Sequence, residues 1–594
     1  MSESAAQTIQ LPKQDDVGQV RTWVDALPKL KLLEHTLVIL EFLKSLQEEN
    51  LSVERRFEIL EIIHPEIEYL QAGHCKQCAQ INFPLDQEQL RAYELVRQLL
   101  DYAYQGYRKV AAGLSAAAEA PHSEQHMLSR SLSCAMEMLS RQVLVALRLY
   151  RSPRPGIWQE IHSLYRFADA KGMLTRRVEH LSDWSAGAAY YRIILTALVS
   201  PGNLMFAEVD QIYALFGKWS SALRVRYPEE LGDGQFLELA KESYTIDLDS
   251  DVPAVYGYDR EHWQQGQLRL LQLDELLSII EAAVRKLTVK QDLSFSELHE
   301  RDLLRRLRNG LSQRGSRKEH RVSGDREVEI IGGLSACHYF ISGKQDFLPE
   351  DDEIKLHDSS AMPAPGLSLA PLEHEGWRED ETRRKLEEGV IRPRAFGFDS
   401  EDQNNDIWSK AEKACVRVKS PLEMAMEKRA EAASGTLLEK DSSVGGFGFF
   451  CPADSVIKFC VGELVAVREA DSAYRLASIR WLQTLDDGSL DIGCQHIPGT
   501  PQAIAVRAVD GRGAALGYQR ALQLDNGNLL VPSGLYAAGN ILIINRQKTL
   551  TAYKLSRLRS ATNSYAEFAV DALEQTSEVK RKISESFYAL LEKR

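Results

Sequence analysis

The sequence has no hydrophobic run of the length that a membrane span needs, and its first residues do not form a secretory signal. No stretch approaches the roughly 18 apolar residues of a transmembrane helix, and residues 1–19 are polar, without a basic start followed by an apolar run. The eight cysteines in 594 residues have no regular spacing, which is typical of free thiols in a reducing compartment. We therefore expect a cytoplasmic protein without membrane insertion.

The chain also lacks an excess of positive charge. The chain has 72 Lys and Arg residues against 85 Asp and Glu, a formal net charge of −13. Because nucleic acids and anionic membranes attract an excess of positive charge, we expect no nucleic-acid partner. A local basic site for a small anion is still allowed, and the stretch from Arg301 to Arg321 has that character. The length allows three or four domains.

Motifs of common enzyme classes are missing as well. The sequence contains no GxxxxGK[ST] phosphate loop, no GxSxG nucleophile turn and no HExxH metal motif. The run from His74 to Cys78 has the two-residue spacing of a metal knuckle, but a structural zinc site needs four ligands and no second pair lies nearby. We expect neither an enzyme nor a metal or cofactor site.

The first 225 residues show the periodicity of successive helices. Apolar residues recur at spacings of three and four, and Asp86 followed by Gln89 predicts a capped helix start. Short connections rich in turn formers favour antiparallel neighbours, so helical hairpins or a bundle are expected. No fixed repeat period identifies the family of this module.

Two short motifs stand out in the second half: an RxxxR segment, Arg317 to Arg321, and a DxSxxG segment, Asp441 to Gly446. The second is followed by β-prone runs at 446–450, 458–467 and 474–482, and then by an Asp487-Gly488 turn leading into 490–497. Motifs and strand order together resemble the PilZ-domain family in the C-terminal region. The resemblance implies an antiparallel β-barrel that binds cyclic dimeric GMP.

The residue types suit that ligand. Arginine offers a rigid fork of donors for guanine O6 and N7 or for a phosphate, and it also stacks on bases. Aspartate accepts from the guanine N1 and N2 donors, and glycine lets the backbone pass close to the base. By resemblance, the expected ligand residues are Arg317, Arg321, Asp441, Ser443 and Gly446, with Arg314, Gly445 and Arg480 as further contacts.

The spacing of the two motifs departs from the family, because Arg321 and Asp441 are 120 positions apart. One explanation is an insert: residues 344–408 are rich in Asp, Glu, Pro and Ser, a composition typical of disorder. The other is a pair of barrels in tandem, in which a β-like run through Ser335 belongs to a degenerate first barrel. The sequence leaves both open.

The fold class is therefore α+β, with an α-helical N-terminal module, a PilZ-like β-barrel region of one or two barrels, and a C-terminal helix over about 565–591. The expected divisions are 1–225, the helical module; 226–311, a mixed segment with connecting helices; 312–342, the RxxxR segment and first β element; 343–411, the acidic insert; 412–505, the barrel with DxSxxG; and 506–594, further strands and the last helix. The expected function is that of a bacterial cyclic dimeric GMP receptor acting on a protein partner in motility, pilus or surface-attachment control. The alternative is a scaffold whose barrel region no longer binds nucleotide.

Overall fold

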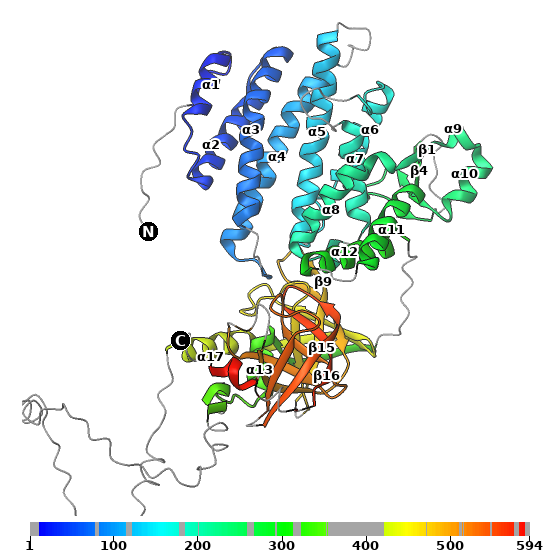
Figure 1. The fold of residues 1–594 in the computed structure, drawn as a ribbon. Helices are drawn as coiled ribbons and strands as arrows, with labels where there is room; N and C mark the ends of the chain where they lie inside the picture. Colours follow the sequence, from blue (N-terminus) through cyan, green and yellow to red (C-terminus); the bar gives the residue numbers. More distant parts are fainter. Residues whose placement is uncertain are drawn as a thin grey trace, which may run out of the picture.

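The structure is a computed structural model in which a helical half precedes two β-barrels (Figure 1). It describes residues 11–77, 82–114, 122–176, 185–199, 201–257, 267–290, 294–312, 322–351, 353–354, 421–470, 472–509, 514, 516–546, 549–574, 576, 581 and 583–588. No helix within these ranges has the length and apolar content needed to cross a membrane.

The N-terminal half is an array of antiparallel helices around one large apolar core. The predicted capping box is confirmed, because the Asp86 carboxylate accepts from Gln89 N (2.8 Å) and Gln89 Oε1 accepts from Asp86 N (3.0 Å). The helices are α1 (Val17–Asp25), α2 (Leu32–Glu48), α3 (Val53–Gln77), α4 (Gln87–Gly113), α5 (His122–Arg148), α6 (Ile157–Ala170), α7 (Ala186–Leu198) and α8 (Phe206–Trp219), with 3-10 turns η2 (Pro201–Asn203) and η3 (Ser220–Ala222).

A small mixed unit connects the helices to the barrels. Its antiparallel sheet has the strand order β1-β4-β2-β3, and the last helix, α12, lies nearest to the barrels in Figure 1. The elements are β1 (Arg224–Arg226), α9 (Pro228–Leu231), α10 (Asp233–Ala240), β2 (Tyr244–Asp247), β3 (Val255–Tyr256), β4 (Leu268–Gln272), α11 (Asp274–Val289) and α12 (Phe295–Ser312).

The first barrel is a closed antiparallel sheet in the order β10-β7-β6-β5-β8-β9. Asp487-Gly488 makes the predicted hairpin turn, with Gly488 at a φ of 86°, a value that favours glycine. The strands are β5 (Val322–Gly332), β6 (Ser434–Ser443), β7 (Gly446–Cys451), β8 (Leu464–Arg468), β9 (Arg475–Thr484) and β10 (Leu490–Ile497); helices α13 (Leu334–Ile341) and α17 (Pro421–Ala432) lie between β5 and β6 in the sequence.

The second barrel is also closed, in the order β11-β12-β13-β16-β15-β14. Two closed barrels therefore follow one another in the sequence. The expected helix over 565–591 is wrong at its start: Tyr565–Ala572 is strand β16, which closes the barrel, and among the described residues that follow, 581 and 583–588 are helical. The strands are β11 (Pro501–Ala508), β12 (Gln519–Leu524), β13 (Leu529–Pro532), β14 (Ile541–Arg546), β15 (Thr549–Ala561) and β16 (Tyr565–Ala572).

The start of the expected acidic insert is not the unstructured segment that its composition predicted. Phe347 lies 4.8 Å below the Arg520 guanidinium, and Pro349 O accepts from Asn545 Nδ2 at 3.0 Å. Glu353 is fully buried, with Arg507 as its ion-pair partner. These residues pack on the second barrel because aromatic contacts and a buried ion pair stabilise a segment that composition alone marks as polar. Residues 355–411 lie outside the described ranges.

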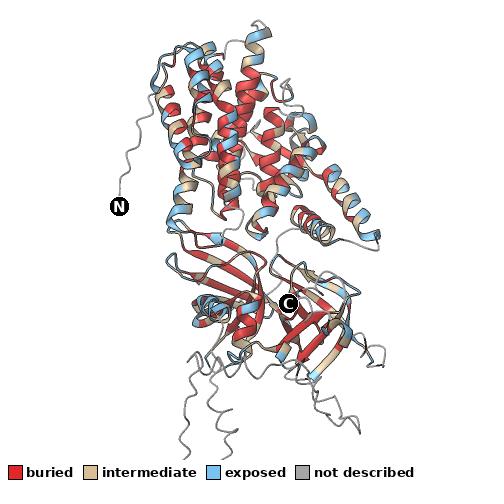
Figure 2. Cartoon of the chain, turned by 60° about the vertical axis from the view of Figure 1, so that its left-hand side comes forward, coloured by how far each residue is buried: buried red, intermediate tan, exposed pale blue. Residues whose placement is uncertain are grey.

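The helical module is joined to the first barrel by backbone hydrogen bonds and by a shared apolar core. Phe83 and Phe459 exchange two N–H···O bonds of 2.8 and 2.7 Å, and Thr484 N donates to Tyr150 O at 2.8 Å. Phe83 and Tyr150 belong to the same buried cluster as the barrel interior, and buried residues line both halves in Figure 2. The interface thus resembles a domain core, in which both parts contribute to the same apolar cluster.

Candidate functional site

A β-bulge sets the direction of the DxSxxG residues. On β6, Glu439 pairs with Phe449 of β7, whereas Asp441 pairs with Gly448, so Lys440 is an extra residue without a partner on β7. Side chains alternate between the two faces of a strand, and an extra residue shifts this alternation by one. Asp441 therefore points away from the face on which Glu439 lies.

The pairs beyond the bulge show which face is which. Ser442 pairs with Phe447, which is 3% exposed and belongs to the core inside the barrel. Its neighbours in the strand, Asp441 and Ser443, consequently point to the outer face, opposite Gly448 and Gly446. Both polar side chains of the motif thus lie on the outside of the barrel.

Two glycines allow a carboxylate and an indole ring to lie against the sheet. A Cβ atom on Gly448 would lie 2.5 Å from Asp441 Oδ1, and one on Gly493 would lie 1.9 Å from Trp481 Nε1. Gly448 and Gly493 are themselves paired across β7 and β10. The Asp441 carboxylate and the Trp481 ring therefore cover neighbouring backbone positions, about one strand spacing of 4.8 Å apart.

A polar row lies beside this pair. Ser443 pairs with Gly446, and Gly446 pairs with Gln495, whose Oε1 accepts from Arg480 Nε at 2.6 Å. Gly446 lies so close to β10 that a Cβ atom would be 2.1 Å from Cys494 O. The row brings a hydroxyl, an amide and a guanidinium to the same outer surface, with backbone between them.

Strand pairing brings the residue that follows the RxxxR segment in the sequence next to the DxSxxG motif. β5 lies beside β6 with Val322 opposite Ser442 and Ser323 opposite Asp441, and Arg321 is the residue before Val322 in the sequence. The expected contacts Arg314, Arg317 and Arg321 lie outside the described residues.

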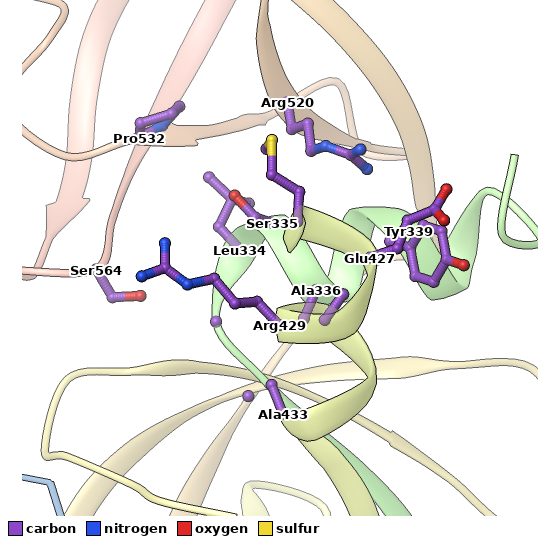
Figure 3. A pocket seen from close by; sticks show the side chains of 14 residues that line it. Leu334, Ser335, Ala336, Tyr339, Glu427, Arg429, Ala433, Arg520, Pro532 and Ser564 are labelled. Atoms are coloured by element: carbon purple, nitrogen blue, oxygen red, sulfur yellow. The ribbon is translucent and has the colours of Figure 1, made fainter. Parts of the chain in front are cut away.

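The hypothesis of a degenerate first barrel built around Ser335 is wrong. β5 and β6 belong to the same barrel, and Ser335 lies on helix α13, which begins at Gly333 with a φ of 84°. Ser335 lines a hollow of about 390 Å³ between the barrels, together with Arg429 and Arg520 (Figure 3). A glycine conformation outside the strand region ends β5 there and starts the helix.

The basic side chains near the DxSxxG motif each contact neighbouring groups of the barrel. The Arg475 guanidinium lies 4.7 Å from the Phe447 ring and donates to Glu469 Oε1 at 2.8 Å. Burial, together with the positive charge of Arg475, lowers the pKa of His496, so this imidazole is neutral at pH 7. His496 N donates to Gly445 O at 2.9 Å. This hydrogen bond connects the β6–β7 turn to strand β10.

Metal-binding groups are not assembled in the part of the chain that the structure describes: no three or more His, Cys, Asp or Glu residues are placed to hold an ion. His74 Nε2 lies 2.8 Å from Thr36 Oγ1, and Cys75 Sγ accepts from Arg148 Nη1 at 2.7 Å. Cys78 lies outside the described residues.

The sequence and the structure thus differ in which residues they place on this surface. The structure brings Asp441, Ser443, Gly446 and Arg480 together on neighbouring strands, with Gly445 in the turn between β6 and β7. Sequence reasoning missed four residues of the same surface: Gly448, Trp481, Gly493 and Gln495. The available signal was a glycine inside each of two apolar strands, because such a glycine often marks a close approach of another group.

Comparison with known proteins finds family matches for two segments of the chain. Residues 18–229 match the family model for the N-terminal domain of the cyclic-di-GMP receptor FimW, and residues 244–503 match the model for its middle PilZ domain. The cyclic-di-GMP receptor FimW of Pseudomonas aeruginosa is 20% identical over 92% of this chain and 89% of its own length. No solved structure matches.

These matches correct one expectation. The PilZ region is central in the chain and is not limited to the C-terminal region, since the matched segment begins at 244, within the expected mixed segment. The helical module, whose family the sequence did not identify, matches a domain found in the same receptor. The chain is therefore similar to the cyclic-di-GMP receptor FimW, with segments that match its N-terminal domain and its middle PilZ domain in the same order.

Proposed function

We propose that the chain binds cyclic dimeric GMP on the outer face of the first barrel. Asp441 accepts from the guanine N1 and N2 donors, Ser443 adds a hydroxyl contact, and the backbone of Gly445 and Gly446 lets the ligand approach closely. Arg317 and Arg321 supply guanidinium groups from the segment before β5, and Arg314 and Arg480 add further contacts.

One observation carries this proposal: strand β5, whose first residue directly follows Arg321 in the sequence, pairs with strand β6, which carries Asp441 and Ser443. The bulge at Lys440 points Asp441 and Ser443 outward, and β5 begins with Val322 opposite Ser442. A ligand with two guanines and two phosphates needs acceptors and cationic donors on the same surface. This face offers the acceptors directly, and Arg321 immediately precedes the strand that borders them.

We further propose that binding changes the affinity of the helical module for a protein partner in the cytoplasm, in control of motility, pili or surface attachment. Strand β9 supports this route. It carries Arg480 and Trp481 on the candidate face, and three residues later Thr484 donates from its N and Oγ1 to Tyr150 O and Leu149 O, at 2.8 and 2.9 Å. A shift of β9 on ligand binding would act directly on the end of α5.

The first prediction concerns affinity and coupling. Asp441→Ala and Arg321→Ala should each weaken cyclic dimeric GMP binding about ten- to a hundredfold in titration calorimetry, since one charge-assisted hydrogen bond contributes roughly 1.5–3 kcal/mol. Because both groups hold one ligand, the double variant should differ from the sum of the singles by about 0.5 kcal/mol or more. GMP and the linear dinucleotide should bind much more weakly.

Two matched controls are available on the same barrel. Asp486→Ala changes an exposed aspartate in the β9–β10 turn, and Arg326→Ala changes an arginine of β5 whose partner is Glu469 at 3.3 Å. Both should bind like the parent. If the parent protein shows no saturable binding at high micromolar ligand, the receptor proposal is wrong and the scaffold alternative is favoured.

A further inference from the structure

A cavity lies where the helical half and both barrels meet. Its volume is about 560 Å³, and α12, β9 and β15 each contribute to its wall. The three parts touch beside it: a Cβ atom on Gly462 of the first barrel would lie 3.2 Å from Thr562 Cβ of the second barrel and 3.4 Å from Met205 Sδ of the helical module. The volume falls within the roughly 300–1,000 Å³ of small-molecule pockets.

The wall of this cavity is strongly cationic in a chain that is acidic overall. Arg305 and Arg306 come from α12, Arg480 from β9 and Arg559 from β15. Their negative partners are fewer: Asp302 lies 3.6 Å from Arg305, and Glu208 pairs with Arg306.

Two further groups decide the balance of charge. Arg559 is exposed and makes no hydrogen bond or ion pair with any residue that the structure describes. His299 also lines the cavity, but burial lowers its pKa, so the imidazole is neutral at pH 7 and contributes no positive charge. Four guanidinium groups thus face two carboxylates, an excess of positive charge that an anion would neutralise.

We propose that this cavity binds a phosphate group of the nucleotide and so extends the candidate surface of the first barrel to α12 and the second barrel. Trp481 makes the two surfaces continuous, because its ring covers Gly493 on the barrel face and also lines the cavity. Guanidinium groups bind phosphate in bidentate geometry, and an indole ring stacks on bases. The identity of the nucleotide rests on the proposed function, whereas the affinity of the cavity for phosphate does not.

The position of the arginines gives the ligand a bridging role. A phosphate held by Arg305, Arg480 and Arg559 contacts the connecting helix, the first barrel and the second barrel at once. Occupancy then favours the one orientation of the three parts in which all three guanidinium groups reach the same anion. This is the means by which a small ligand biases the helical module.

The test uses the full chain and two probes, cyclic dimeric GMP and inorganic pyrophosphate, each followed by titration calorimetry at low salt. Arg559→Ala should weaken the binding of both probes about tenfold or more, as expected for loss of a charge-assisted hydrogen bond. Arg557→Ala, an exposed arginine on the same strand that does not line the cavity, is the matched control and should bind both probes like the parent. The same comparison can be made on α12: Arg305→Ala removes an arginine of the cavity wall and should weaken binding, and Arg308→Ala, which lies outside the cavity, is its control.

The outcomes separate the two proposals. Asp441→Ala should weaken cyclic dimeric GMP binding and leave pyrophosphate binding unchanged. If the parent binds pyrophosphate through Arg559 but does not bind cyclic dimeric GMP, the receptor function fails and the anion cavity stands. If the parent binds no pyrophosphate, or if Arg559→Ala binds both probes like the parent, the cavity proposal is overturned. Since Arg559 is exposed, its variant should keep the parent's thermal midpoint.

Discussion

Replacing Glu353 with alanine should destabilise the second barrel by about 3–5 kcal/mol, the cost of leaving one partner of a buried ion pair alone. Glu353 is 0% and Arg507 2% exposed. The two side chains form bonds of 2.6 and 2.9 Å, and Tyr518 OH donates to the same carboxylate at 2.5 Å. Without the carboxylate, the Arg507 guanidinium stays buried, and its remaining acceptors among the described residues are Ser586 Oγ and Ile583 O.

Chemical unfolding monitored by circular dichroism measures this loss. Asp351→Ala, two residues away and exposed, should be within about 0.5 kcal/mol of the parent. The double variant Glu353→Leu with Arg507→Met should recover much of the stability, because it removes both charges and leaves neither one unpaired. A single variant Glu353→Ala as stable as the parent would show that this contact does not stabilise the barrel.

The second large loss of stability is expected when Gly446 is replaced. Gly446→Ala should destabilise the first barrel by about 1–3 kcal/mol, because the new Cβ would lie 2.1 Å from Cys494 O and 3.4 Å from Gln495 Cα. Both contacts are backbone atoms of β10, so relief requires the β7–β10 pairing to open. Hydrogen exchange of the paired amides should increase along β7 and β10, and ligand binding should be lost with the register.

Gly448→Ala is the informative comparison, because its new Cβ meets a side chain and not a backbone. The Asp441 carboxylate, 2.5 Å away, can rotate to make room. This variant should therefore lose less stability than Gly446→Ala, yet weaken cyclic dimeric GMP binding about as much as Asp441→Ala does. Equal stability of the two glycine variants would contradict the close approach of Gly446 to β10.

Local signals in the sequence were sufficient wherever the structure depends on neighbours in the chain. Asp86 and Gln89 cap α4 as predicted, since the two groups are three residues apart and bond each other. Asp487-Gly488 lies in the β9–β10 turn as predicted, and Gly488 has a φ of 86°, which favours glycine. The prediction of a helix over 565–591 is wrong in its first part, because residues 565–572 pair with the distant strands β13 and β15.

The sequence by itself determined the class of fold and the residues of the DxSxxG motif, because helix periodicity, caps, turns and this motif each involve residues that are close together in the chain. The tertiary structure alone decided three things: the bulge at Lys440 that turns Asp441 outward, the burial of Glu353 from an acidic segment, and the approach of Trp481 to Gly493. Each depends on strand register or on a partner more than ten residues away. Register is set by the pairing of whole strands and by the packing of two barrels, so no local pattern specifies it.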